Sequence, residues 1–193
     1  MADLGDIITS KVRIKILELF FSNPDEMYHV RGVVREIKEE INAVRRELAR
    51  LEKSGILKKE PRGNRVYYWP RTDHFMFGDI LSVVSKMTGL GLAINSNKKI
   101  GNPSIIMFSG RFARRKERKR EDDVDILIVG EVNLPELASL VRMEESKRGM
   151  EINYTVMTRD ELEYRKKRRD PFLQGILAGS RVMILGDEDN LVS

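Results

Sequence analysis

Apolar positions in the first part of the chain recur with the period of a helix. Segments 7–21, 30–36 and 41–54 each place apolar side chains three or four residues apart, as on one face of a helix. Ser10 suits the N-cap of the first segment, and Gly55 follows the third, where a left-handed residue ends many helices. The pattern therefore predicts three successive helices.

Two short segments with strand character follow, at 56–60 and 65–69. They flank Pro61-Arg62-Gly63-Asn64, whose composition is typical of a hairpin loop. Helix, helix, helix and hairpin, in that order, predict a winged helix-turn-helix over residues 1–72.

The third predicted helix carries polar and basic side chains opposite its apolar face. Arginine and asparagine suit base edges and phosphates, and Glu47 is the only acidic residue within this set. A basic helix face can be merely solvated, but this one is followed by a basic wing, which favours binding to double-stranded DNA. The residues expected to contact DNA are Asn42, Arg45, Arg46, Arg50, Lys53, Arg62, Asn64 and Arg65.

Several motifs of this part of the chain resemble ArsR-like winged-helix regulators. They are the segments 27–31, 46–57 and 62–68, which match the leucine-rich third helix, the glycine turn after it and the glycine-containing wing. Many members of that family sense metals through cysteines, and this chain has none. The resemblance therefore implies the DNA-binding fold and not metal sensing.

A connecting region follows the wing. Residues 73–88 predict a helix with an apolar stripe, which either packs on its own winged domain or forms a dimer seam. We favour a homodimer, because winged-helix regulators usually pair to read two half-sites. Residues 89–103 predict an irregular joint, so the divisions expected are 1–72, 73–103 and 104–193. The stripe consists of Phe77, Ile80, Leu81, Val84 and Met87.

The second half predicts an α/β arrangement, so the whole chain is expected to be α+β or α/β with a small mixed sheet backed by helices. The segment 124–129 is nearly all β-branched or leucine, which is typical of a central strand buried on both faces. The other predicted strands are 104–108, 151–157 and 181–185, and the predicted helices are 134–147, 159–165 and 171–177.

Two carboxylates stand at the head of the central strand. Asp123 and Asp125 are two residues apart, so in a strand both side chains would point to the same face. Like charges held that close require a cation or another partner, and Mg²⁺ prefers carboxylate oxygens. Glu151 heads the next predicted strand and is the candidate third carboxylate. The pattern predicts a metal site formed by Asp123, Asp125 and Glu151.

The second half is similar to the minimal nucleotidyltransferase family of the DNA polymerase beta superfamily. The matching residues are Phe108-Ser109-Gly110, the segment 123–129 and the segment 151–156. The resemblance implies catalytic and metal-binding roles for Asp123, Asp125 and Glu151, with Mg²⁺ and ATP or another nucleoside triphosphate. It also implies nucleotide binding by Ser109, Gly110 and Arg111. Family enzymes usually carry glycine and then serine in this turn, and here the order is reversed.

Charge and composition narrow the class of partner. The chain has 193 residues, a net charge of +5 and a pI near 9.4, which favours a polyanion. The absence of cysteine excludes disulfides and thiolate sites, and two histidines are too few for a zinc site. No apolar run approaches the ~20 residues needed to cross a bilayer. A soluble, cytoplasmic protein without membrane contact is expected.

Basic tracts at 111–120 and 165–169 are either solvated or phosphate-binding. For the first tract, a phosphate-binding tongue over the acidic site is the functional interpretation.

The favoured function is a DNA-binding transcriptional regulator whose second domain binds Mg-nucleotide without turnover. The alternative is an active nucleotidyltransferase targeted or autoregulated by the winged helix. It could serve as an antitoxin-like protein with a small helical toxin as partner, which rests on fold analogy alone.

Overall fold

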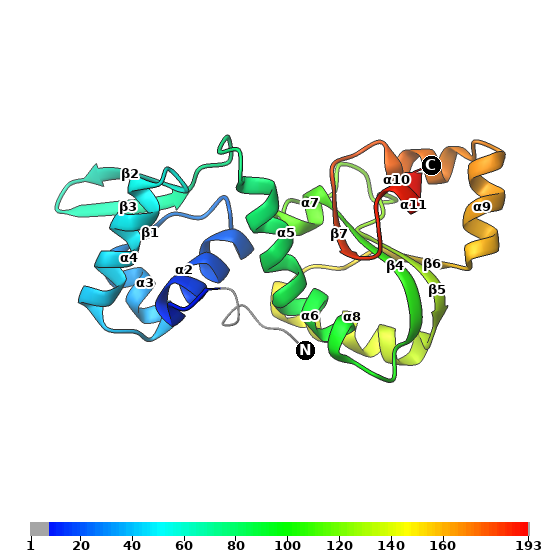
Figure 1. Cartoon of the computed structure of the whole chain (residues 1–193), viewed down its shortest axis with the longest axis horizontal. Helices are drawn as coiled ribbons and strands as arrows, with labels where there is room; N and C mark the ends of the chain where they lie inside the picture. The colour runs from blue at the N-terminus through cyan, green and yellow to red at the C-terminus, as the bar shows by residue number, and fades with distance from the viewer. Residues whose placement is uncertain (1–7, 193) are drawn as a thin grey trace. The chain divides into compact units, whose positions relative to one another are not determined.

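The computed structural model describes residues 8–192 and shows a mixed α+β chain (Figure 1). It divides into two compact units, Met1–Met87 and Thr88–Ser193, each with its own sheet. Residue 7, the expected start of the first helix, lies outside the described residues.

The helices of the first unit begin and end close to where their capping residues predict. Ser10 accepts a hydrogen bond from the backbone N of Arg13, which confirms it as an N-cap. Gly55 has φ +77°, the left-handed conformation expected after the third helix. The helices are α2 (Lys11–Ser22), α3 (Val30–Ile37), α4 (Ile41–Lys53) and α5 (Phe77–Met87).

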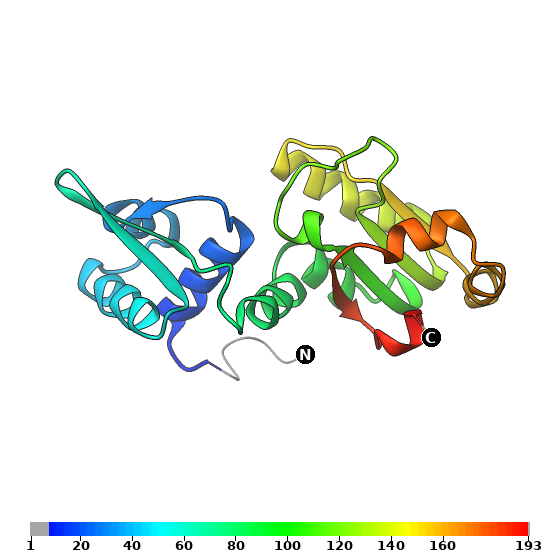
Figure 2. The same ribbon diagram turned by 90° about the horizontal axis from the view of Figure 1, so that it is seen from above.

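The sheet of the first unit has three strands in the order β1-β3-β2, all antiparallel. They are β1 (Tyr28–His29), β2 (Leu57–Arg62) and β3 (Arg65–Pro70). Arg62 pairs with Arg65, so the hairpin turn contains only Gly63 and Asn64 and is tighter than the predicted loop. The hairpin extends beyond the helices of its own unit (Figure 2).

The apolar stripe of α5 packs within the first unit. The helix begins at Phe77, four residues later than predicted, and its buried residues are Phe77, Leu81 and Val84. The rings of Phe21 on α2 and Phe77 lie 5.4 Å apart. The stripe therefore belongs to the core of its own unit. The homodimer stays a prediction, but the stripe no longer supports it.

The second unit begins with a helix where an irregular joint was expected. That expectation was wrong because Leu90 and Ile94 bury an apolar face of α6 (Gly89–Ser96), which contacts α8 (Leu134–Arg148). Burial thus outweighs the low helix propensity of glycine and asparagine. The remaining helices are α7 (Gly110–Ala113), α9 (Arg159–Lys167), α10 (Pro171–Leu177) and α11 (Asp189–Val192).

The sheet of the second unit has four strands in the order β6-β5-β4-β7. Central β5 (Ile126–Val132) is parallel to β6 (Tyr154–Met157) and antiparallel to β4 (Gly101–Ser109), which pairs with β7 (Arg181–Leu185). The first four residues of β5 are buried, which confirms the predicted central strand. However, β5 begins at residue 126 rather than 124, and β6 at 154 rather than 151. All three candidate acids therefore precede the strands.

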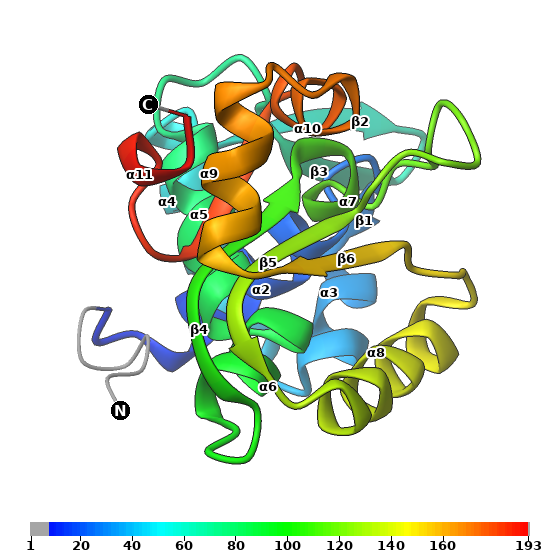
Figure 3. The ribbon, with the colours of Figure 1, turned by 90° about the vertical axis from the view of Figure 1, so that its right-hand side faces the viewer.

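Helices cover both faces of this sheet, with α6 and α8 on one side and α9 and α10 on the other (Figure 3). The helices α9 and α10 bring Leu162 and Leu173 against Met107 and Leu127 of the sheet. Met107 and Leu127 are on strands, where successive side chains alternate between the two faces of the sheet.

Within residues 8–192, no single helix has the length and hydropathy required to cross a membrane. Among the described helices, only α5 and α6 taken together, across the bend between them, reach that length and composition.

Candidate functional site

The basic face of α4 is exposed in the first unit. Val44, Leu48 and Leu51 of the same helix are buried, so the helix turns its apolar side to the core. Within the described residues, Arg45, Arg46 and Lys53 form no ion pair. The exposed residues on the polar side are Asn42, Arg45, Arg46, Ala49, Arg50 and Lys53.

Glu47, on the same helix, forms its shortest ion pair with a residue outside this face. Glu47 as a whole is only 9% exposed, and its Oε2 atom lies 2.8 Å from Nε of Arg13 on α2. Ser10 also donates to Glu47 Oε1 at 3.2 Å. Glu47 Oε1 also lies 3.8 Å from Nη1 of the exposed Arg50, so the charge of Arg50 is partly offset. Arg13 takes the shorter ion pair, and Arg45, Arg46 and Lys53 keep their positive charge.

The hairpin presents the predicted wing residues to solvent. Arg62, Asn64 and Arg65 are all exposed. Arg62 pairs with Glu60 at 3.0 Å, so its charge is partly compensated. Arg65 has no ion-pair partner within residues 8–192, which makes it the stronger candidate for a phosphate contact.

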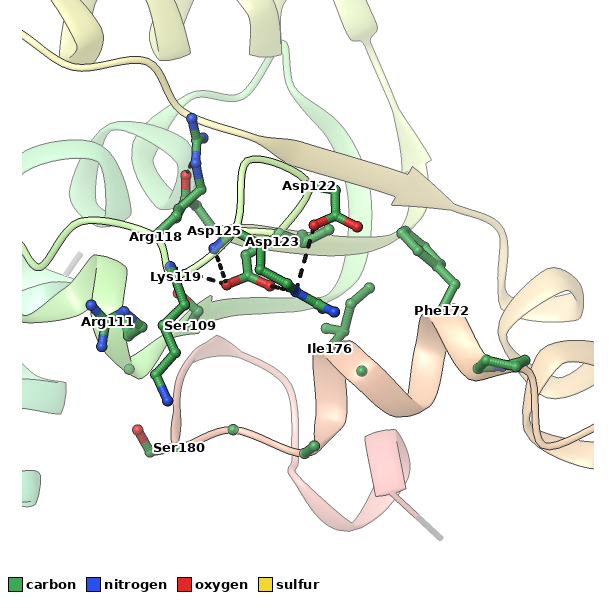
Figure 4. A pocket seen from close by; sticks show the side chains of 17 residues that line it. Ser109, Arg111, Arg118, Lys119, Asp122, Asp123, Asp125, Phe172, Ile176 and Ser180 are labelled. Carbon is green, nitrogen blue, oxygen red and sulfur yellow. Dashed lines mark hydrogen bonds and ion pairs between the residues drawn. The ribbon is translucent and has the colours of Figure 1, made fainter.

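The second unit contains a cavity of about 580 Å³ next to the predicted nucleotide-binding turn. Figure 4 shows it between α10, with Phe172 and Ile176, and the loop that carries Arg118 and Lys119. Ser109, Gly110, Arg111, Asp123 and Asp125 all line it, whereas Glu151 does not. Five of the six residues predicted for this site are thus brought together.

Ser109 and Gly110 have local structural roles. Ser109 Oγ accepts from the backbone N of Phe112 and caps α7. Gly110 donates its backbone N–H to Ser180 O at 2.6 Å, so that N–H is already engaged. A Cβ atom at Gly110 would lie 2.1 Å from Ser180 Oγ, which explains the glycine by close packing rather than by a phosphate nest.

Asp123 belongs to a turn and not to a strand. Its Oδ2 atom accepts from the backbone N atoms of Lys119 and Arg120, each at 3.2 Å, and Arg120 Nε donates to Oδ1 at 3.1 Å. Partial burial acts to raise the pKa of Asp123, but these hydrogen bonds and the Arg120 charge outweigh it and lower the pKa.

Asp125 is 2% exposed and lies where β5 is about to begin. Its Oδ2 atom accepts from Arg118 Nη1 and from the backbone N of Asn153, both at 3.0 Å. Burial raises the pKa of this carboxyl, and the Asn153 N–H and the Arg118 charge oppose the rise. Asn153, and not Glu151, is the residue before β6 that reaches Asp125.

Glu151 points into solvent, with its side chain 78% exposed. Its Oε2 atom lies 3.7 Å from Arg118 Nη2. Among the described residues, no group of three or more histidine, aspartate or glutamate side chains is placed to hold a metal ion. Asp123 and Asp125 thus line the cavity while Glu151 is turned outward, and Mg²⁺ binding by the three carboxylates stays a prediction.

Arg118, Phe172 and Ile176 are site residues that the sequence pattern did not single out. Arg118 was one of many cations in the tract 111–120, and nothing in the sequence distinguishes the one that folds back. Phe172 and Ile176 are four residues apart on α10, a helix that was predicted, but without an indication of what it covers.

Two of the five cations in the second basic tract are paired with carboxylates. Arg165 pairs with Glu161 at 2.8 Å and with Asp170 at 3.2 Å, and Lys166 pairs with Glu163 at 3.2 Å. Lys167, Arg168 and Arg169 are exposed and form no ion pair within residues 8–192, so solvation and phosphate binding both stay predictions for 165–169.

Comparisons of the chain with models of protein families, with curated proteins and with solved structures give no significant match.

Proposed function

We propose that this protein is a DNA-binding transcriptional regulator whose first unit is a winged helix-turn-helix. The observation that carries the proposal is the exposed basic face of α4, whose acidic neighbour Glu47 is ion-paired with Arg13. The element order and the three-stranded antiparallel sheet with its projecting hairpin support it.

The exposed side chains divide into two classes by chemistry. Asn42, Arg45 and Arg46 near the N-terminal half of α4 suit base edges, because amide and guanidinium groups form paired hydrogen bonds with adenine and guanine. Lys53 and Arg65 suit the phosphate backbone, which fixes position and not sequence. We also propose a homodimer, because paired half-sites double the number of bases that are read.

Selection from a library of random duplexes tests the proposal. The full chain should enrich a defined sequence, and Arg46→Ala should weaken or erase that enrichment. Arg142 is an exposed residue of α8, outside the proposed face, and Arg142→Ala is the matched control for loss of one positive charge. Recovery of unenriched sequences by the unaltered chain would refute a sequence-specific regulator.

We further propose that the cavity of the second unit binds a nucleotide, as a signal for the regulator. Four cationic side chains line it, and Phe172 and Ile176 provide an apolar wall suited to a base. The lining cations are Arg111, Arg118, Lys119 and Arg120.

Nucleotidyl transfer is the second candidate function. It is favoured by Asp123 and Asp125, which both line the cavity beside Ser109. Incubation with labelled ATP, Mg²⁺ and RNA, protein or small acceptors tests it. Transfer that Asp125→Asn abolishes would support an enzyme, and no transfer to any acceptor would leave ligand binding as the function of the cavity.

A further inference from the structure

A guanidinium group lies between two of the three carboxylates that the sequence pattern assigns to a metal. Arg118 Nη1 is 3.0 Å from Asp125 Oδ2, and Nη2 is 3.7 Å from Glu151 Oε2. The Arg118 side chain is 17% exposed, so it is folded into the unit rather than extended into solvent. One positive group of the chain therefore contacts both acids.

The neighbouring residues of the same loop engage the third carboxylate. Asp123 receives two backbone N–H groups and the Arg120 side chain, which leaves both of its oxygens hydrogen-bonded. Mg²⁺ demands near-octahedral oxygen ligands and keeps several waters. Residues 118–120 thus supply from the protein the positive charge and hydrogen bonds that the carboxylates need.

Four cations and three aspartates line the cavity, so one positive charge is in excess. The third aspartate, Asp122, has its Oδ1 atom 3.6 Å from Arg120 Nε. Arg111 and Lys119 line the cavity and have no carboxylate partner within residues 8–192. Arg111 donates its Nε to the backbone O of Glu117, which holds its stem in place without cancelling its charge. In Figure 4 the Lys119 side chain extends toward Ser180, which also lines the cavity.

We infer that Arg118 is a built-in counter-ion for Asp125, and that the cavity binds a nucleoside triphosphate without a divalent cation. This rests on the proposed nucleotide-binding function and deepens it. A free triphosphate carries more negative charge than its Mg²⁺ complex, so Arg111 and Lys119 attract the free form more strongly. The tract 111–120 then acts as the tongue that neutralises the acids and receives the phosphates.

Calorimetric titration of the full chain with ATP, in EDTA and in excess Mg²⁺, tests the inference. ATP should bind in EDTA with a Kd equal to or lower than that in Mg²⁺. Binding that occurs only with Mg²⁺ would overturn the inference and leave the proposed nucleotide function intact. No binding in either buffer would overturn both.

Substitutions of the pair test the role of Arg118 itself. Arg118→Gln leaves Asp125 buried and uncompensated, so ATP binding in EDTA should weaken about 10-fold, and Mg²⁺ should restore it. Arg142→Gln, the control for an exposed arginine of the same unit, should bind like the unaltered chain.

The double variant Arg118→Gln/Asp125→Asn removes both charges. It replaces the single variant in the test if the single variant does not fold. It should bind ATP in EDTA within about 3-fold of the unaltered chain, because the net charge of the cavity is restored. Loss of ATP binding by a folded double variant would overturn the counter-ion role. Unchanged ATP binding by Arg118→Gln in EDTA would also overturn it.

Discussion

Nε of Arg13 lies 2.8 Å from Oε2 of Glu47, and this pair joins α2 to α4 in the first unit. The Glu47 side chain is 12% exposed and that of Arg13 is 31% exposed, so the carboxylate depends on its partner more than the guanidinium does. The pair both anchors α4 and offsets the negative charge of Glu47 beside the face proposed to bind DNA.

Arg13→Ala should therefore destabilise the first unit. Loss of a hydrogen bond to a largely buried charge should lower the free energy of unfolding by about 1–2 kcal/mol. Chemical denaturation followed by circular dichroism measures it. Adding Glu47→Gln should recover part of the loss, because a neutral amide is less costly to leave without an ionic partner. If the two changes are simply additive, the pair does not stabilise the unit in this way.

Gly110→Ala should destabilise the second unit. The new Cβ would meet Ser180 Oγ at 2.1 Å and Ser180 O at 2.8 Å, which forces α7 away from the chain before β7. A loss of about 1–3 kcal/mol is expected from such overpacking. Gly175→Ala is the matched control, because nothing lies within 4 Å of its Cβ position. Gly175 is within α10, so this control should be neutral or stabilising.

Acid should weaken the N-terminus of α4 through Glu40. Its carboxylate accepts from the backbone N atoms of Asn42 and Ala43, both at 2.8 Å, and these bonds lower the pKa of Glu40. A lowered pKa in the folded state means that the stabilisation is present above the ordinary glutamate pKa. It is lost as the pH falls through the lowered value.

The difference in unfolding free energy between the unaltered chain and Glu40→Ala should thus shrink toward zero in acid. Glu36→Ala, an exposed glutamate of α3 with no ion pair within residues 8–192, is the control. A difference that stays constant from neutral to acidic pH would show that the charged cap is not the cause.

The wing should contribute charge rather than sequence recognition. Arg65→Gln is expected to weaken binding to all duplexes alike and to reduce the slope of log K against log salt by about 1. Titrations at several salt concentrations, with a selected and a shuffled duplex, measure it. A loss confined to the selected duplex would instead assign base recognition to Arg65.

Local patterns predicted most elements, because their signals lie within each segment. The strand Arg181–Leu185 and the helix Pro171–Leu177 have the predicted bounds. The two-residue strand Tyr28–His29 was missed because it is too short for a period to show. It exists through its pairing with Tyr67 and Tyr68 of β3.

The acidic site shows what such patterns leave out. Asp123 and Asp125 alternate as in a strand, but Asp123 is bound by backbone N–H groups of a turn and never enters the sheet. Glu151 has the expected spacing, yet Asn153 is the residue whose backbone meets Asp125. The first outcome depends on how residues 119 and 120 fold back, and the second on how β6 pairs with β5. Both are tertiary properties.

Fluorescence anisotropy with a selected and a shuffled duplex, at physiological salt, tests the DNA-binding proposal most directly. The unaltered chain should prefer the selected duplex by about 10³-fold or more. Arg46→Ala should reduce that preference by about 1–3 kcal/mol, whereas Arg142→Ala should preserve it. Equal affinity of the unaltered chain for both duplexes, or a preference unaffected by Arg46→Ala, would contradict recognition through α4.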